Sequence, residues 1–351
     1  MKKPSVDIII LHHNGIDNID NCLKSVLKTK YANFNIIIVD NNSTDGSIKV
    51  IEKKYKPLYI IRNRKNYGYA KGNNIGIMKS NAKYVVLLND DTIVKSNWLD
   101  ELVKVAESNN KIATCQPKVL SLHNKKYFDN CGAGSFLDYY GYPIYRGRVF
   151  DYREIDKGQY DNPSSIFFSV GVCTLMRKSV LDEVGLLDED FHIYFEEFDL
   201  CWRMNLRGYI HKSVPSAVIY HIGGVTYKKK SFKWSYLNHR NSMIMLLKNY
   251  SFATILWVMP LRIFFELISM VRFLFGSPSR ALAVLLAILW VFTHPFTILK
   301  KHRKTQKLRI LEDKDIMRMM VSRSAVIQHF IFRKKYFNEF EGYIKAFKEN
   351  E

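Results

Sequence analysis

Three short polar clusters in the N-terminal part of the chain carry side chains that could bind a polar ligand. Each cluster comes directly after a run of apolar, largely β-branched residues. The members of interest are Asn14 in the first cluster, Asp40 and Asn42 in the second, and Asn89, Asp90 and Asp91 in the third. Carboxylate oxygens bind divalent cations, and amide and carboxylate oxygens accept hydrogen bonds from sugars and bases. One such cluster is typical of an ordinary turn, but three in series indicate a binding site.

A second set of side chains with chemical potential lies around residue 200. Glu197 falls in the first turn of an expected helix over 195–207, where Asp199 and Arg203 are spaced to form an ion pair. His221 follows an expected strand and precedes two glycines. A carboxylate can act as a general base, and imidazole is a ligand for manganese-type cations. The alternative interpretation is structural: a helix-end charge for Glu197 and a hydrogen-bonded histidine for His221.

The elements that must position these residues alternate along the chain. Strands are expected over 6–11, 35–39, 57–61 and 84–88, and helices over 17–29 and from residue 43 onward. Apolar strands alternating with amphipathic helices predict an α/β fold with a parallel sheet covered on both faces. Ligands bind at the carboxyl ends of the strands in such sheets, which is where the three polar clusters fall. The glycine fingerprint of dinucleotide-binding enzymes is absent after the first strand, which argues against a nicotinamide or flavin enzyme.

Five segments in series carry a stronger signal than any of these residues alone. They are IIVDNNSTDGS at 37–47, NYGYAKGNNIG at 66–76, LLNDD at 87–91, FEEFDLCWR at 195–203 and YHIGG at 220–224. In this order they resemble the family-2 inverting glycosyltransferases, and most of all the bacterial rhamnosyltransferase-type enzymes of surface polysaccharide synthesis. The resemblance covers about residues 5–225. It implies a GT-A fold, a mainly parallel sheet in a three-layer sandwich, used by enzymes that bind nucleotide-diphospho-sugars.

The resemblance also implies a reaction and a set of donor-binding residues. A hexosyl- or rhamnosyltransferase of this kind moves a sugar from a UDP- or dTDP-sugar to a hydroxyl of a glycan or lipid-linked glycan. Asp40 would accept the imide N–H of the base, and Gly171, in an expected strand over 169–177, would allow close backbone approach under the sugar. The other expected donor-binding residues are Asn14, Asn42, Asn66, Asn73, Asn89, Asp90 and Asp91. The segment 121–165 resembles the mobile acceptor-side loop of the family.

A divalent cation, Mg²⁺ or Mn²⁺, is a further expectation from the resemblance. The Asp-x-Asp motif of the family reads Asn89-Asp90-Asp91 here, so an amide replaces the first carboxylate. Asp91 and His221 are the expected metal ligands, Asn89 would contact the ribose, and Asp90 is an ambiguous second carboxylate. Because one acid is missing, weakened metal affinity is expected.

Glu197 is the expected general base, at a position where the family usually carries aspartate, and Asp199 is the alternative. The sequence leaves two alternative functions. A sugar-nucleotide nucleotidyltransferase would need a glycine-rich phosphate loop with Arg or Lys after the first strand, and residues 12–15 do not supply it. A non-catalytic membrane-bound relative is disfavoured because acids and a histidine remain at the expected site positions.

Composition places the basic charge in the C-terminal third. The chain has 351 residues, 47% of them hydrophobic, and a net charge of +20, which excludes a disordered or wholly membrane-buried protein. Residues 1–222 contain 30 basic and 25 acidic side chains, whereas 223–351 contain 23 and 8. Such an excess indicates a polyanionic partner. No nucleic-acid-binding motif accompanies it, so an anionic membrane surface is expected and no nucleic acid.

The C-terminal third also contains two apolar runs, over 252–275 and 281–299, followed by the basic cluster 300–304. Together they predict a helical hairpin that lies in or on the cytoplasmic leaflet. Two core helices or a full membrane span are the alternatives. The expected organisation is therefore a GT-A glycosyltransferase domain over 1–225 and a basic, helical, membrane-associating region over 226–351, at the cytoplasmic face of the cell membrane.

Overall fold

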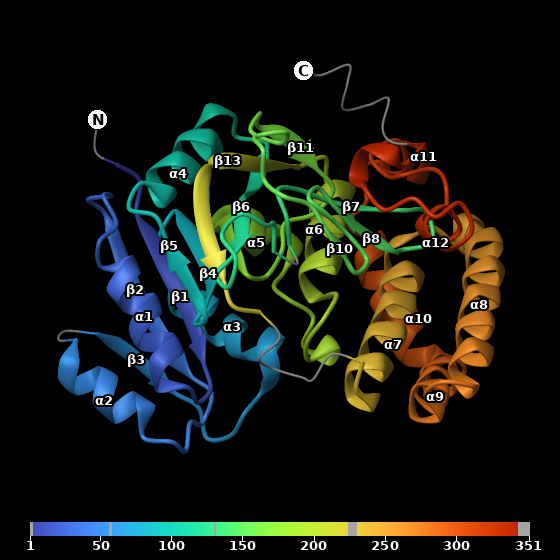
Figure 1. Cartoon of the computed structure of the whole chain (residues 1–351), viewed down its shortest axis with the longest axis horizontal. Coiled ribbons are helices and arrows are strands. Elements are labelled where there is room, and N and C mark those ends of the chain that lie inside the picture. The colour runs from blue at the N-terminus through green and yellow to red at the C-terminus, as the bar shows by residue number, and fades with distance from the viewer. Residues whose placement is uncertain (1–2, 56–57, 130, 224–229, 343–351) are drawn as a thin grey trace.

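The computed structural model describes residues 3–55, 58–129, 131–223 and 230–342. A nine-stranded sheet forms its centre (Figure 1). The strands are β1 (Val6–His12), β2 (Phe34–Asp40), β3 (Tyr59–Arg62), β4 (Tyr84–Asn89), β5 (Thr92–Val94), β6 (Ile112–Ser121), β11 (Ser164–Ile166), β12 (Cys173–Arg177) and β13 (Ile210–His221). Their order is β11-β13-β6-β12-β4-β1-β2-β3, with β5 beside β13. β4, β1, β2 and β3 form a parallel core, and β12 is antiparallel to β4. The expected α/β class with a largely parallel sheet is confirmed.

Helices cover both faces of this sheet because successive side chains of a strand point to opposite faces. Ile8 and Ile10 of β1 lie in the same buried cluster as Leu23 of α1 (Ile16–Val26) and residues of α4 (Trp98–Ser108). Ile9, between them, lies in a second cluster with Ile77 of α3 (Gly68–Lys79) and residues of α5 (Lys178–Val184) and α6 (Glu196–Leu206). This alternation gives three layers, with the sheet between two layers of helices. A further short helix, α2 (Ser47–Lys54), connects β2 to β3.

The glycine-rich stretch 66–74, whose composition predicts a connection between two strands, is instead helical from Gly68 onward and forms the first part of α3. A glycine inside a helix costs about 1 kcal/mol relative to alanine. Here the missing side chains let the helix approach β1. A Cβ atom on Gly72 would lie 2.5 Å from Leu11, and one on Gly76 would lie 2.5 Å from Ile9. Packing on the sheet therefore outweighs the poor helix propensity.

Two other expectations in the middle of the chain are corrected. The strand expected over 169–177 begins only at Cys173, and residues 169–172 form a turn that carries Gly171. The acceptor-side segment 121–165, expected to be a mobile loop, contains a small four-stranded antiparallel sheet. Its strands are β7 (Ser135–Leu137), β8 (Pro143–Tyr145), β9 (Arg148–Val149) and β10 (Tyr152–Arg153).

The C-terminal region is helical, as expected, and gathers at one side of the molecule, away from α1 and α2 (Figure 1). It consists of α7 (Phe232–Asn249), α8 (Phe252–Leu274), α9 (Pro278–Thr293), α10 (Pro295–Gln306), α11 (Asp313–Arg318) and α12 (Ala325–Phe330). The second apolar run is broken near His294, where α9 and α10 meet at a bend of 72°. By length and composition α8 could cross a membrane, as could α9 and α10 taken together. The charged residues Arg262 and Glu266 of α8 are buried as an ion pair.

Candidate functional site

The register of the sheet brings the three polar clusters to one edge. β1 pairs in parallel with β2 so that His12 lies beside Asp40, and with β4 so that Leu11 lies beside Asn89. The carboxyl ends of these three strands therefore end at the same level. Asn14 follows in the turn after β1. The expected clustering of these side chains at one sheet edge is observed.

At the end of β2, Asp40 closes a turn with one carboxylate oxygen. Its Oδ1 accepts a hydrogen bond from the backbone N–H of Ser43 at 2.9 Å. The side chain of Asn14 accepts from the N–H of Thr44 at 2.8 Å, so it ties the first cluster to the second. Asn42 is exposed and has a left-handed backbone with φ of 70°. These three residues line the same loop, and the turn geometry leaves Asn42 and one Asp40 oxygen for a ligand.

The amides further along the chain are used mainly within the protein. Asn66 Oδ1 accepts from the Gly68 N–H at 2.9 Å and from the Asn41 side chain at 2.8 Å. Asn73 is buried and donates to the Tyr69 carbonyl at 3.0 Å inside α3. Asn73 therefore lies in a structural position, and the expectation that it contacts the donor receives no support from its contacts.

Sequence reasoning missed the two residues that organise this edge, Asn41 and His12. Asn41 is buried, and besides donating to Asn66 it accepts from Asn63 Nδ2 and the Tyr67 N–H, each at 3.0 Å. His12 places Nδ1 2.6 Å from Asp90 Oδ2 and Nε2 2.8 Å from Ser47 Oγ. Burial raises the pKa of Asp90 despite the hydrogen bond to His12. The signal that could have identified His12 is its place at the end of β1, directly beside the other clusters.

The expected metal ligands Asp91 and His221 lie side by side. Asp91 Oδ1 is 3.2 Å from His221 Nε2, and its Oδ2 accepts from the Gly223 N–H at 3.3 Å. On the other side of the imidazole, Nδ1 lies 2.6 Å from Asp129 Oδ2. Burial alone would lower the pKa of His221, but the hydrogen bonds to Asp129 and Asp91 raise it to about 10. Gly224, the last residue of the fifth sequence motif, lies outside the described residues.

This arrangement fits a divalent cation in its donor chemistry. A metal-bound histidine usually gives its second ring N–H to a carboxylate, which is the position of Asp129. Nε2, once it has lost its proton, and the Asp91 carboxylate would then both face the cation. Asp129 has no motif of its own in the sequence and was not anticipated. Within the described ranges no cluster of three or more His, Cys, Asp and Glu side chains forms a complete protein-only metal site, so a cation here would need further ligands from a bound nucleotide.

Glu197 lies at the start of α6 with one oxygen fixed and one without a partner. Its Oε1 accepts from the Gly171 N–H at 3.1 Å, and the Gly171 carbonyl accepts from the Tyr69 hydroxyl at 2.6 Å. A Cβ atom on Gly171 would lie 2.7 Å from that hydroxyl, so only glycine fits between the two side chains. Glu197 Oε2 is buried without a hydrogen-bond partner among the described residues. Burial raises the pKa of Glu197 to about 7, and it raises that of Glu196 well above its usual range.

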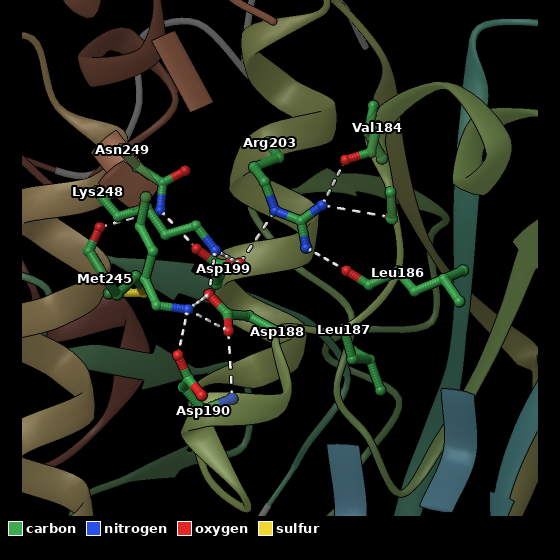
Figure 2. A network of polar contacts seen from close by, with 12 residues as sticks. Val184, Leu186, Leu187, Asp188, Asp190, Asp199, Arg203, Met245, Lys248 and Asn249 are labelled. Atoms are coloured by element: carbon green, nitrogen blue, oxygen red, sulfur yellow. Dashed lines mark hydrogen bonds and ion pairs between the residues drawn. The ribbon is translucent and has the colours of Figure 1, made fainter. Parts of the chain in front are cut away.

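Asp199, the alternative base, is fully buried and has every partner it needs (Figure 2). Its Oδ2 accepts from Arg203 Nε at 3.0 Å and from Lys248 Nζ at 2.8 Å, and its Oδ1 accepts from Asn249 at 2.9 Å. The expected ion pair of Asp199 with Arg203 is present, but it is buried rather than on the surface. Lys248 also pairs with Asp188, which joins α6, α7 and the turn before α6 into one network.

The fold and this edge of the sheet define a class of protein. A parallel core with acids, amides and a histidine at its carboxyl edge, followed by a helix that carries a base-like carboxylate, is the architecture of GT-A nucleotide-sugar enzymes. Residues 7–185 match the family model described as Glycosyl transferase family 2. The chain belongs to glycosyltransferase family 2.

Named relatives share part of their length with this chain. The low-salt glycan biosynthesis hexosyltransferase Agl10 of Haloferax volcanii is 25% identical over 207 residues, 56% of this chain and 61% of Agl10. The poly-β-1,6-N-acetyl-D-glucosamine synthase of Staphylococcus aureus is 25% identical over 258 residues, 68% of this chain and 57% of the synthase. The chain thus spans less than two thirds of the length of either. The crystal structure of GalNAc-T7 with UDP, GalNAc and Mn²⁺ has a TM-score of 0.56 at 17% identity, covering 70% of this chain and 48% of that one, a likeness of fold.

Proposed function

We propose that the protein is an inverting glycosyltransferase that moves a hexosyl or rhamnosyl group from a UDP- or dTDP-sugar to a hydroxyl of a glycan or lipid-linked glycan. The observation that carries the proposal is the pair of Glu197 and Gly171. A carboxylate is held through one oxygen by a backbone N–H, keeps the other oxygen buried and unpartnered, and has a pKa of about 7. A general base is most effective when its pKa is close to the working pH. The family membership and the polysaccharide and glycan activities named for the relatives support the substrate class.

The sheet edge would hold the nucleotide. Asp40 keeps one oxygen for the imide N–H of a uracil or thymine base, and Asn14 and Asn42 lie in the same loop. Asn89, at the end of β4, would contact the ribose. Asp91 and His221 would hold a Mg²⁺ or Mn²⁺ ion. Such an ion, when bound, neutralises charge on the departing diphosphate.

Glu197 would take the proton of the acceptor hydroxyl at Oε2 while Gly171 holds Oε1. Inversion follows if the acceptor oxygen attacks the anomeric carbon in a single displacement, opposite the departing diphosphate. Because Oε2 is covered in the free protein, the acceptor must displace a neighbouring side chain or turn the carboxylate about Oε1. The space that the missing side chain of Gly171 leaves is filled by Tyr69 and Glu197, so Gly171 would serve here by holding Oε1 rather than by admitting the sugar.

The reaction can be tested with the purified full-length chain. The protein is incubated with Mn²⁺ and a panel of UDP- and dTDP-sugars, with and without glycan acceptors, and released nucleotide diphosphate is measured. NMR of the product then gives the configuration at the anomeric carbon. We expect acceptor-dependent release from one donor and an inverted product. A retained configuration would contradict the mechanism, and release of pyrophosphate from a sugar phosphate and a nucleoside triphosphate would identify a nucleotidyltransferase instead.

We further propose that the protein works at the cytoplasmic face of the membrane. The outer faces of α8 and α9 present a broad apolar surface. Its exposed members include Phe264, Leu267, Ile268, Val271, Leu274 and Phe275 near the end of α8, and Leu282, Leu285, Leu286, Leu289 and Phe292 on α9. A contiguous apolar surface of this kind marks a contact with protein or membrane, and the nearby exposed Lys300, Arg303 and Lys304 favour anionic lipid.

A further inference from the structure

The segment that leads into α6 has an unusual backbone. His192, Tyr194 and Phe195 have φ values of 63°, 72° and 72°, in the left-handed region that residues with side chains rarely adopt. Such a backbone conformation is strained and persists only where surrounding contacts enforce it. These three residues directly precede Glu196 and Glu197. The orientation of Glu197 therefore depends on the contacts that keep residues 192–195 in this conformation.

The side chain of Asn241, on α7, forms hydrogen bonds to one side of this segment. Its side chain is fully buried, and its Nδ2 lies within hydrogen-bond distance of three carbonyl oxygens of this segment: Phe191 at 3.0 Å, Ile193 at 3.0 Å and Tyr194 at 2.8 Å. Its Oδ1 accepts from Arg240 Nε at 2.9 Å, which orients the amide. An amide nitrogen has two hydrogens, so the three carbonyls share them. The left-handed backbone allows three carbonyls within four residues to point toward one donor.

The start of α3 contacts the same segment from the opposite side. The His192 carbonyl accepts from the backbone N–H groups of Tyr69 at 2.8 Å and Ala70 at 3.1 Å, at the start of α3. A Cβ atom on Gly68 would lie 2.2 Å from the His192 ring, so the two segments are in close contact. The segment 192–195 thus lies between α3, which carries Tyr69 next to Gly171, and α7, which carries Asn241.

We propose that Asn241 is a positioning residue for sugar transfer: by gathering the carbonyls of residues 191, 193 and 194 it fixes the left-handed backbone that directs Glu197 onto the Gly171 N–H. The inference rests on the proposed role of Glu197 as the base. It assigns part of the catalytic arrangement to the C-terminal helical region, outside the residues that match the family model. Lys248 and Asn249 on the same helix hold Asp199 in the first turn of α6, so α7 contacts the chain both before and after Glu197.

Three variants of the full-length protein test the inference. Asn241→Ala removes the donor, whereas Asn241→Asp keeps the size of the side chain but turns an acceptor toward three carbonyls. Asn238→Ala is the matched control, since Asn238 lies three residues earlier on α7 and donates to the Trp234 carbonyl of its own helix. A misplacement of about 1 Å can cost about 100-fold in rate. We expect kcat to fall about 10- to 100-fold in Asn241→Ala and further in Asn241→Asp, with the donor KM changed less than about threefold, and both values nearly unchanged in Asn238→Ala.

Two further readouts separate positioning from a merely structural role. Hydrogen–deuterium exchange should rise over residues 189–199 in both Asn241 variants and not in Asn238→Ala. The pH at which kcat rises should shift, because Glu197 would be displaced from the titratable groups around it. These groups are Glu196 on α6, Tyr69 on α3, Tyr145 on β8, and Cys131 and Cys201. An Asn241→Asp variant as active as wild type would overturn the inference, as would faster exchange with kcat and its pH dependence unchanged. If the Asn241 variants behave as expected but Glu197→Gln keeps normal turnover, the proposed base is wrong and the positioned group is another one.

Discussion

Glu197 and Asp199 stand two residues apart in the first turn of α6, and their carboxylates lie in opposite environments. With 3.6 residues per turn, two positions correspond to about 200° around the helix axis. Glu197 therefore faces the Gly171 turn, and Asp199 faces α7 and its cationic partner Lys248. One carboxylate keeps an unpartnered oxygen, and the other accepts three hydrogen bonds. Helix geometry thus separates a candidate base from a structural acid within a single short motif.

Glu197→Gln is expected to lower kcat by about 10²- to 10⁴-fold, the usual contribution of a general base. Glutamine keeps the size of the side chain and the hydrogen bond from Gly171 but cannot take a proton. Donor affinity, measured by isothermal titration with the nucleotide sugar, should stay within about twofold. Glu197→Asp, which restores the usual family residue, should retain some activity. Near-normal turnover in Glu197→Gln would show that Glu197 is not the base.

Asp199→Asn is expected to destabilise the protein rather than to alter catalysis specifically. Removing one partner of a buried ion pair leaves the other charges uncompensated and typically costs about 3–5 kcal/mol. Here Arg203 and Lys248 would both lose a carboxylate. Urea unfolding followed by circular dichroism should show the loss, and the folded fraction should keep its turnover per molecule. A variant with unchanged stability and no activity would favour Asp199 as the base.

Turnover is expected to rise with pH through about 7, because Glu197 must be ionised to accept a proton. The same group should affect stability in the opposite sense. The pKa of Glu197 in the folded protein is raised above its value in the unfolded chain, so the folded state binds the proton more tightly. Folding stability therefore falls as pH rises from the unfolded pKa to about 7. Glu197→Gln should therefore be more stable than wild type at pH 8 and similar to it at pH 4. Equal stability of the two proteins at both pH values would contradict the burial argument.

Asp91→Asn is expected to abolish Mn²⁺-dependent binding of the nucleotide diphosphate, and His221→Ala to weaken it less. Asp129→Asn should also matter, although Asp129 is not an expected ligand. Residues that orient a metal-bound histidine usually contribute about 10- to 100-fold in metal affinity. Titration of UDP at fixed Mn²⁺ gives the binding constants. If chelation by EDTA leaves turnover unchanged, basic side chains must carry the phosphate charge instead.

Full-length protein is expected to float with anionic phospholipid vesicles, and less so at high salt, which screens the basic residues. Leu267→Asn together with Val271→Asn should weaken flotation, because both side chains are about half exposed on one face of α8. The matched control replaces Val50 and Met78, exposed apolar residues of the catalytic domain, by asparagine. Equal flotation of the two double variants would place the membrane contact elsewhere. Point variants are preferable to truncation after residue 225, which would leave Asp199 without Lys248 and Asn249.

The sheet edge was predictable because its elements obey local rules. Apolar strands that alternate with helices predict a parallel core, and parallel strands bring their carboxyl ends together, so Asp40 and Asn89 could be placed at the same edge of the sheet from sequence alone. The helix α3 could not be predicted in this way, since its glycines have poor helix propensity. They are explained by the close packing of α3 on β1, where Gly72 meets Leu11.

The supporting residues of the site were beyond sequence reasoning for a different reason. Asp129 lies 92 residues before His221 in the chain, and Asn241 lies 47 to 50 residues after the carbonyls that it contacts. Neither residue belongs to a periodic pattern or a motif that names its partner. Asparagine and aspartate are also frequent in ordinary turns and caps. Only the three-dimensional arrangement shows which amide and which carboxylate hold the site together.

The network around Asp199 also has a consequence for the order in which the chain folds. Ribosomes release a protein from its N-terminus, and a nascent domain folds as its segments emerge. When α6 leaves the ribosome, Lys248 and Lys301, which pair with Asp199 and Asp188, have not yet been synthesised. Bringing these acids into the interior before then would leave Asp188 without its two lysines and Asp199 with Arg203 alone. The last steps that complete the environment of α6 must therefore await translation of α7 and α10, so the newborn enzyme matures only after the helices of its apolar surface have been made.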